Sequence, residues 1–184
     1  MRSNEKKGAG LRRRRQRGVH LIEFLLVLLP LLAFMGVLMD ASWAIFVKAT
    51  LQYAVRTGVR TGITITGTQA TAANQTLVQM VKSTVQANSL GLLNGATGLS
   101  YIQVNFFAQD SSSSTGLTNV NSSPTGNVSP NIMQVSVNGF PLAALFPRFF
   151  NWHTPVDLAK TKINAMAADE IEPSSDVPTM GTAP

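Results

Sequence analysis

The sequence predicts an α+β protein in which a long N-terminal transmembrane helix leads into a small head with one further helix and a short antiparallel sheet. Three observations predict this architecture. Residues 24–39 contain no charged side chain. Apolar residues between positions 69 and 89 recur at helical spacing, and the segments 100–107 and 132–138 alternate in part between apolar and polar side chains, as strands do. A chain of 184 residues has room for one compact domain and an anchor.

Most of the positive charge lies at the N-terminus. The chain has 15 Lys and Arg residues, of which eight precede Gly18, and the seven that follow are balanced by eight acidic residues. The basicity therefore belongs to a leader, residues 1–18, and not to a domain, so we expect no nucleic-acid partner. Contact of these side chains with the anionic headgroups of the lipid bilayer accounts for the same residues.

The apolar segment predicts a single membrane-spanning helix over residues 19–47. With its flanks it exceeds the roughly 20 residues that cross the hydrocarbon of a bilayer, and only Glu23 and Asp40 carry charge within it. The alternative is a buried helix of a soluble protein, but a domain this small has little core in which to surround such a helix. Basic residues resist translocation, so we expect a cytoplasmic N-terminus and a head outside the bacterial inner membrane.

The helix has two possible fates after export. A secretory signal peptide would be cleaved after the small residues of Ser42-Trp43-Ala44, which would leave a mature chain that begins at Ile45. The apolar run is longer than the usual 7–15 residues of such signals, and Asp40 lies just before the site. We therefore expect the helix to be retained.

A glutamate stands where the leader meets the apolar run. Glu23 is the fifth residue after Gly18 and is followed by Phe24. A carboxylate this close to the hydrocarbon is costly unless it reaches the headgroups or finds a counter-charge. Cleavage between Gly18 and Val19 would supply one, because the new amine of one subunit can neutralise Glu23 of a neighbour and set the register of an assembly. Snorkelling of Glu23 to the interface is the alternative.

These residues carry a family resemblance. The stretch RGVHLIEFLLVLLPLL resembles the leader and helix of type IV pilin-like proteins, and residues 17–62 resemble the TadE-like family of the tight-adherence (Flp) pilus system. The matching features are Glu23-Phe24, Pro30, Gly36, Asp40 and the segment LQYAVRTGVR with Arg56, Gly58 and Arg60. The resemblance implies a minor pseudopilin that is processed by a prepilin peptidase, stays in the inner membrane and acts with other pilus or pseudopilin subunits.

The helix is expected to extend past the membrane to about Gly62, so that residues 48–68 form an extension and linker. Gly58 and Gly62 stand four apart on a face of small side chains, which allows close helix approach. Arg56 and Arg60 share another face. We predict contacts with a partner at these four residues, with a solvated basic face as the alternative for the arginines, and a helix kink at Pro30.

The head is expected over residues 69–171. It contains a helix from 69 to 89, strands at 100–107 and 132–138, a flexible loop at 110–130, an aromatic loop at 140–155 and a third strand within 156–166. The tail 172–184, rich in Pro, Ser and Thr, is expected to be disordered.

The sequence contains no recognisable catalytic, cofactor or metal site. It has no cysteine and only two histidines, which leaves almost no material for a zinc site or a catalytic triad. In the segment GITITGT, Thr68 stands where a phosphate-binding loop needs lysine. We therefore expect a non-enzymatic pilus component. The alternatives are an uncleaved signal-anchored binding module or adhesin and, with no residues to support it, a secreted enzyme.

Overall fold

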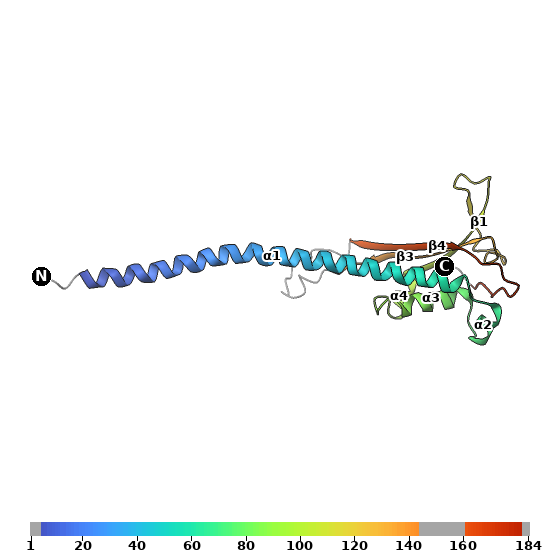
Figure 1. Ribbon diagram of the computed structural model, residues 1–184, viewed down its shortest axis with the longest axis horizontal. Coiled ribbons are helices and arrows are strands. Elements are labelled where there is room, and N and C mark those ends of the chain that lie inside the picture. Colours follow the sequence, from blue (N-terminus) through green and yellow to red (C-terminus); the bar gives the residue numbers. More distant parts are fainter. Residues whose placement is uncertain (1–4, 144–160, 182–184) are drawn as a thin grey trace. The chain divides into compact units, whose positions relative to one another are not determined.

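The computed structural model describes residues 5–143 and 161–181 (Figure 1). The chain divides after Trp43 into an N-terminal helical unit and a head that begins at Ala44. The elements in chain order are α1 (Glu5–Gly62), α2 (Gly67–Ala72), α3 (Leu77–Ala87), α4 (Gly95–Ser100), β1 (Ile102–Gln109), β2 (Leu117–Asn119), β3 (Ile132–Pro141) and β4 (Lys162–Glu170). The predicted α+β class is confirmed, although three short helices follow α1 where the sequence predicted one.

Helix α1 ends at Gly62, as predicted, and continues through Pro30 without interruption. In its N-terminal unit the apolar side chains point outward: Leu26 is 71% exposed and Leu29 is 65% exposed. The most apolar stretch of the helix is only 6% buried. The alternative of a buried helix in a soluble core is therefore wrong for this segment.

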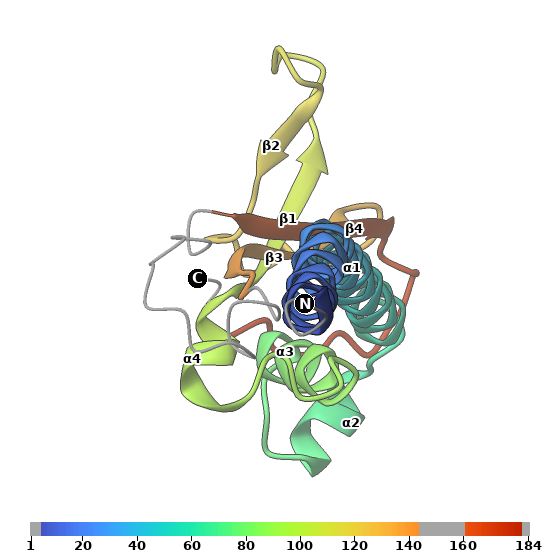
Figure 2. The same cartoon turned by 90° about the vertical axis from the view of Figure 1, so that its left-hand side faces the viewer.

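The C-terminal part of α1 belongs to the core of the head. Apolar side chains repeat every four residues along one face of the helix and are almost fully buried: Val47, Leu51, Val55 and Val59. Figure 2, which looks along α1, shows the sheet on one side of this part of the helix and α3 on the other. The sequence predicted only an extension and linker here, whereas the helix supplies a large share of the apolar surface that the head buries.

The face of small residues on α1 packs within the head. Thr50 and Ala54 are 8% and 0% exposed. A Cβ on Gly58 would overlap the Cγ2 atom of Val85 in α3, and a Cβ on Gly62 would lie 2.5 Å from the Cε atom of Met133 in β3. The close approach that we predicted between Gly58, Gly62 and a partner is therefore used by the head itself, because its own helix and strand occupy this face.

The predicted helix from 69 to 89 is two helices. Each begins with a capping box: Thr66 accepts from the N–H of Gln69 at the start of α2, and Thr76 accepts from the N–H of Gln79 at the start of α3. Asn74, between the helices, has a left-handed backbone with φ of 52°, which asparagine tolerates better than most residues. The second capping box marks a new helix start, so one continuous helix does not form.

The sheet is antiparallel with strand order β2-β1-β3-β4. Ile102, Val104 and Phe106 of β1 face the core, and the register pairs Val104 with Val135 and Val135 with Ala167. Many residues on the opposite face, such as Gln103, Asn105 and Gln134, are polar, as in an antiparallel sheet with one solvated side. The strands predicted at 100–107 and 132–138 are thus β1 and β3. The third strand lies four to six residues later than predicted, as β4.

The segment 110–130 is not a simple hairpin loop. Its residues Leu117–Asn119 form β2, which pairs with β1, and Asn121 ties the segment to β1 by accepting from the N–H of Phe106 at 2.6 Å. Within the predicted aromatic segment 140–155, Phe140 packs edge-on against Tyr101 with ring centroids 5.9 Å apart. Residues 144–155 of that prediction lie outside the described residues.

The C-terminal segment is held to the head, in contrast to the predicted disorder. Residues 171–181 run past the N-termini of α2 and α3, where the carbonyl oxygens of Asp176, Thr179 and Met180 accept from the N–H groups of Gly67, Leu77 and Val78 at 2.9, 2.9 and 3.2 Å. Asn127 also donates to the carbonyl of Pro178 at 2.6 Å. The first N–H groups of a helix have no partner within the helix, so this segment satisfies donors that would otherwise need water. Residues 182–184 lie outside the described residues.

Substitution of Asp176 by asparagine should lower the stability of the head in a pH-dependent way. The backbone N–H and hydroxyl of Thr68 donate to Asp176 Oδ2 at 2.9 and 2.7 Å, and these bonds hold the pKa of Asp176 below its usual value. A lowered pKa in the folded state stabilises the fold at pH values above the unfolded pKa, and this stabilisation is lost as the pH falls through the folded pKa.

The check is a series of thermal melts of the full chain in detergent between neutral and acidic pH. At neutral pH the Asp176→Asn protein should melt below the wild type, and the two melting temperatures should converge at low pH. Glu172→Gln, which makes the same change of charge in the same segment, should track the wild type throughout. Equal gaps at all pH values would contradict the role of the ionised carboxylate.

Candidate functional site

The described residues offer surfaces for contact and no chemical centre. Among residues 5–143 and 161–181, no three His, Asp or Glu side chains lie close enough to hold a metal ion. A cleft of about 270 Å³ lies between the end of α1, the loop 127–129 and the segment 171–178. Many of its lining side chains are apolar, such as Ile65, Leu77 and Met133, so the cleft presents few groups that could take part in catalysis.

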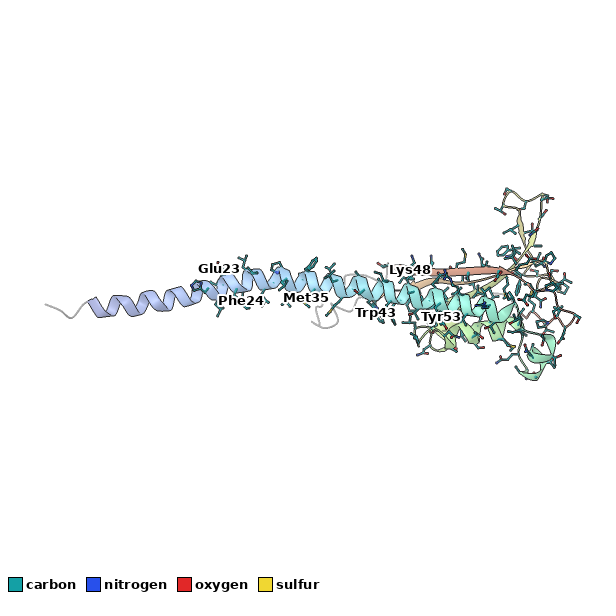
Figure 3. The ribbon with its side chains drawn as sticks, in the orientation of Figure 1. Glu23, Phe24, Met35, Trp43, Lys48 and Tyr53 are labelled. Atoms are coloured by element: carbon teal, nitrogen blue, oxygen red, sulfur yellow. The ribbon has the colours of Figure 1, made fainter. Side chains whose placement is uncertain are left out.

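The first candidate region is the start of the apolar helix. Gly18 and Val19 lie within the helical backbone of α1. Glu23 and Phe24 follow one to two turns later, and Figure 3 shows both side chains directed away from the helix axis. The Phe24 side chain is 63% exposed, so nothing within this helix covers the position where we predicted assembly contacts.

Among the side chains that the structure describes, Glu23 has one neighbour on the same helix that can carry a positive charge. The Nδ1 atom of His20 lies 3.6 Å from Glu23 Oε2, one turn away, and both side chains are largely exposed. An exposed pair of this kind contributes little to stability. The contact therefore leaves the carboxylate accessible to a stronger partner, such as an amine from another chain.

Helix α1 is the element that can anchor the chain. Among the described helices, the stretch from His20 to Gly62 is long and apolar enough to cross a membrane, judged by length and composition. The side chains of Leu21, Ile22, Leu26 and Val37 are all more than 60% exposed. This outward apolar surface is typical of a helix whose solvent is lipid.

The second candidate region is a groove within the head, between the C-terminal part of α1 and β4. It has a volume of about 450 Å³ and is lined by Gln52, Arg56, Val59 and Arg60 from α1 and by residues 166–169 from β4. Residues 52, 56 and 60 are each one turn apart, so they form one row along the helix. Two of the four predicted contact residues, Arg56 and Arg60, therefore lie together in this groove, whereas Gly58 and Gly62 are buried.

The groove carries net positive charge. Both arginines are exposed, and neither guanidinium forms a hydrogen bond or an ion pair with any residue that the structure describes. Asp169 is the acidic residue of the lining, and its carboxylate already accepts from the N–H of Glu170 at 2.9 Å. Two unpaired guanidinium groups facing one engaged carboxylate favour an acidic ligand.

The other wall of the groove is the outer edge of the sheet. β4 stands at one end of the strand order and pairs only with β3. Gln52 Nε2 donates to the outward carbonyl of Met166 at 2.8 Å. Since backbone groups alternate between the two sides of a strand, the N–H and C=O of Ala168 point the same way as those of Met166, and they form no hydrogen bond with the described part of the chain.

The residues that complete this groove were not predicted from the sequence. Gln52 was within reach, because it precedes Arg56 by one turn and shares its face. No local sequence pattern indicated that residues 166–169 would line the groove, because 114 positions separate Gln52 from its hydrogen-bond partner Met166. Only the folded arrangement of α1 and β4 brings them together.

Comparison with known proteins identifies one segment. The TadE-like protein family matches residues 18–60. No curated protein and no solved structure gives a significant match. The match begins at Gly18, includes Glu23 and the apolar run, and ends at Arg60 in the groove. The chain therefore carries a TadE-like segment at residues 18–60.

Proposed function

We propose that the protein is a non-enzymatic minor subunit of a Tad/Flp-type pilus assembly system, anchored in the bacterial inner membrane by α1 with its head outside the cytoplasm. The observation that carries the proposal is the start of the TadE-like segment at Gly18, where the basic leader ends and five residues before Glu23. The eight basic residues ahead of it favour a cytoplasmic N-terminus.

In the proposed mechanism a prepilin peptidase cleaves between Gly18 and Val19. The cut removes the basic leader and creates an amine on Val19, close in sequence to the apolar segment. An amine and a carboxylate that each stand alone at the edge of the hydrocarbon are costly, and their pairing across two subunits relieves both. Glu23 and the new amine would thus fix the axial register of neighbouring helices, and Phe24 would pack beside them.

The decisive experiment is mass spectrometry of the mature protein isolated from membranes of the native host. A chain that begins at Val19 is the expected result. A chain that begins at Ile45 would show ordinary signal-peptide cleavage and loss of the anchor, which overturns the proposal. An intact leader would remove the amine–carboxylate mechanism and favour a signal-anchored binding module, whose activity should survive exchange of the membrane helix for an unrelated one.

A further inference from the structure

We propose that the groove between α1 and β4 binds an extended acidic segment of a neighbouring pilus subunit, with carboxylates at alternate positions that pair with Arg56 and Arg60. This inference rests on the proposed function, because it is the assembly that supplies the neighbouring subunit. It adds to that function the place on the head where contact is made and the chemistry of the partner.

The open edge of β4 explains why the partner is an extended segment. Edge strands with unpaired N–H and C=O groups accept a further strand readily, and proteins usually block them with short length, proline or inward charges. β4 has nine residues and no proline. The N–H of Met166 and both backbone groups of Ala168 point into the groove without a partner in the described chain, and the small side chains of Ala167 and Ala168 permit close approach.

The spacing of the arginines explains why the acidic residues alternate. Residues four apart on a helix are separated by about 6 Å along its axis. Side chains on one side of an extended strand recur every two residues, which is about 6.6 Å. Two carboxylates at positions i and i+2 of an extended segment therefore meet Arg56 and Arg60 in step, whereas adjacent carboxylates point to opposite sides of the segment.

The charge of the site excludes a basic partner and disfavours a purely apolar one. Burial of two unpaired guanidinium groups under an apolar chain would leave their donors unsatisfied, which is costly. Carboxylates satisfy those donors in a bidentate geometry suited to arginine. The groove has a volume of about 450 Å³, which is enough for one peptide segment.

Fluorescence anisotropy with two labelled nine-residue peptides of valine and threonine tests the proposal on the full chain in nanodiscs of zwitterionic lipid. One peptide carries two glutamates two positions apart, and the other carries them next to each other. We expect the first to bind at least tenfold more tightly. Arg56→Glu combined with Arg60→Glu should weaken that binding at least tenfold. Lys82→Glu, which reverses a cation on α3, a helix that does not line the groove, should leave it unchanged.

The contribution of the β4 edge has its own variant. Ala168→Pro removes an N–H that points away from β3, so the pairing of β4 with β3 should persist, and binding of the alternating peptide should fall. Thermal melts of every variant identify any that do not fold. Equal binding of the two peptides, or unchanged binding by the double arginine variant, would overturn the proposal.

Complementation in the native host separates this inference from the function on which it rests. If the double arginine variant assembles pili as the wild type does while Glu23→Gln does not, the groove proposal alone fails. If both variants assemble normally, the proposed function fails as well. Loss of assembly in both, with Lys82→Glu unaffected, is the expected result.

Discussion

Replacement of Glu23 by glutamine should reduce incorporation of the protein into pili by at least tenfold, and replacement by alanine should abolish it. The substitution removes a charge at the boundary of the hydrocarbon and leaves the partner amine without a counter-ion. A charge without a counter-ion beside the hydrocarbon is costly, and a cost of about 1.4 kcal/mol already changes an equilibrium tenfold. Immunoblots of sheared pili and of membrane fractions, compared at equal expression, measure the effect.

His20 provides the control for this experiment. Its Nδ1 atom is the neighbour of Glu23 within the same helix, at 3.6 Å. If the glutamate acts through an amine on another subunit, His20→Ala should still be incorporated, whereas both Glu23 variants should remain in the membrane and resist alkaline extraction. Normal piliation by Glu23→Gln would refute the role in registry.

Truncation of Leu51 to alanine should destabilise the head by about 2–5 kcal/mol, the range for large-to-small changes at closely packed sites. Leu51 is 0% exposed and belongs to the buried row of apolar side chains on α1. The C-terminal part of α1 has the sheet on one side and α3 on the other (Figure 2). A loss of this size is a large fraction of the 5–15 kcal/mol that stabilises a typical domain. Chemical denaturation of the full chain in detergent, followed by near-ultraviolet circular dichroism, measures it.

Tyr53 is the matched control, two residues further along the same helix. Its side chain is 62% exposed, so Tyr53→Ala should change the free energy of unfolding by no more than about 0.5 kcal/mol. Similar small effects for both variants would show that α1 is a passive extension, as the sequence alone predicted, and not a part of the core.

Local sequence patterns predicted correctly those features that depend on residues close together in the chain. The apolar run, the end of α1 at Gly62 and the alternation of β1 and β3 all depend on neighbours in sequence. The break between α2 and α3 was also legible, because Thr66-Gln69 and Thr76-Gln79 are two separate capping boxes. The helical spacing of apolar residues across positions 69–89 predicted one continuous helix instead, and that prediction was wrong.

Contacts between residues far apart in the chain could not be predicted from local sequence patterns. Thr68 and Asp176 are 108 positions apart, so a polar tail read by composition alone gave no sign that Asp176 would cap α2. The same limit applies to the groove. The sequence showed that Arg56 and Arg60 share one face of α1, but it did not show that β4 lies opposite them. The two arginines were therefore predicted as a contact surface without the strand edge that gives the surface its form.

The C-terminal segment has a consequence for the order of events during synthesis. Residues 176–180 complete the N-termini of α2 and α3, and residues of α1 fill the centre of the same head, so the first and last parts of the head are needed together. A large share of contacts between residues far apart in sequence slows folding. These contacts can form only after residues 176–180 have left the ribosome. We therefore expect the complete head to fold after its synthesis, which leaves the chain unfolded for passage through a translocation channel.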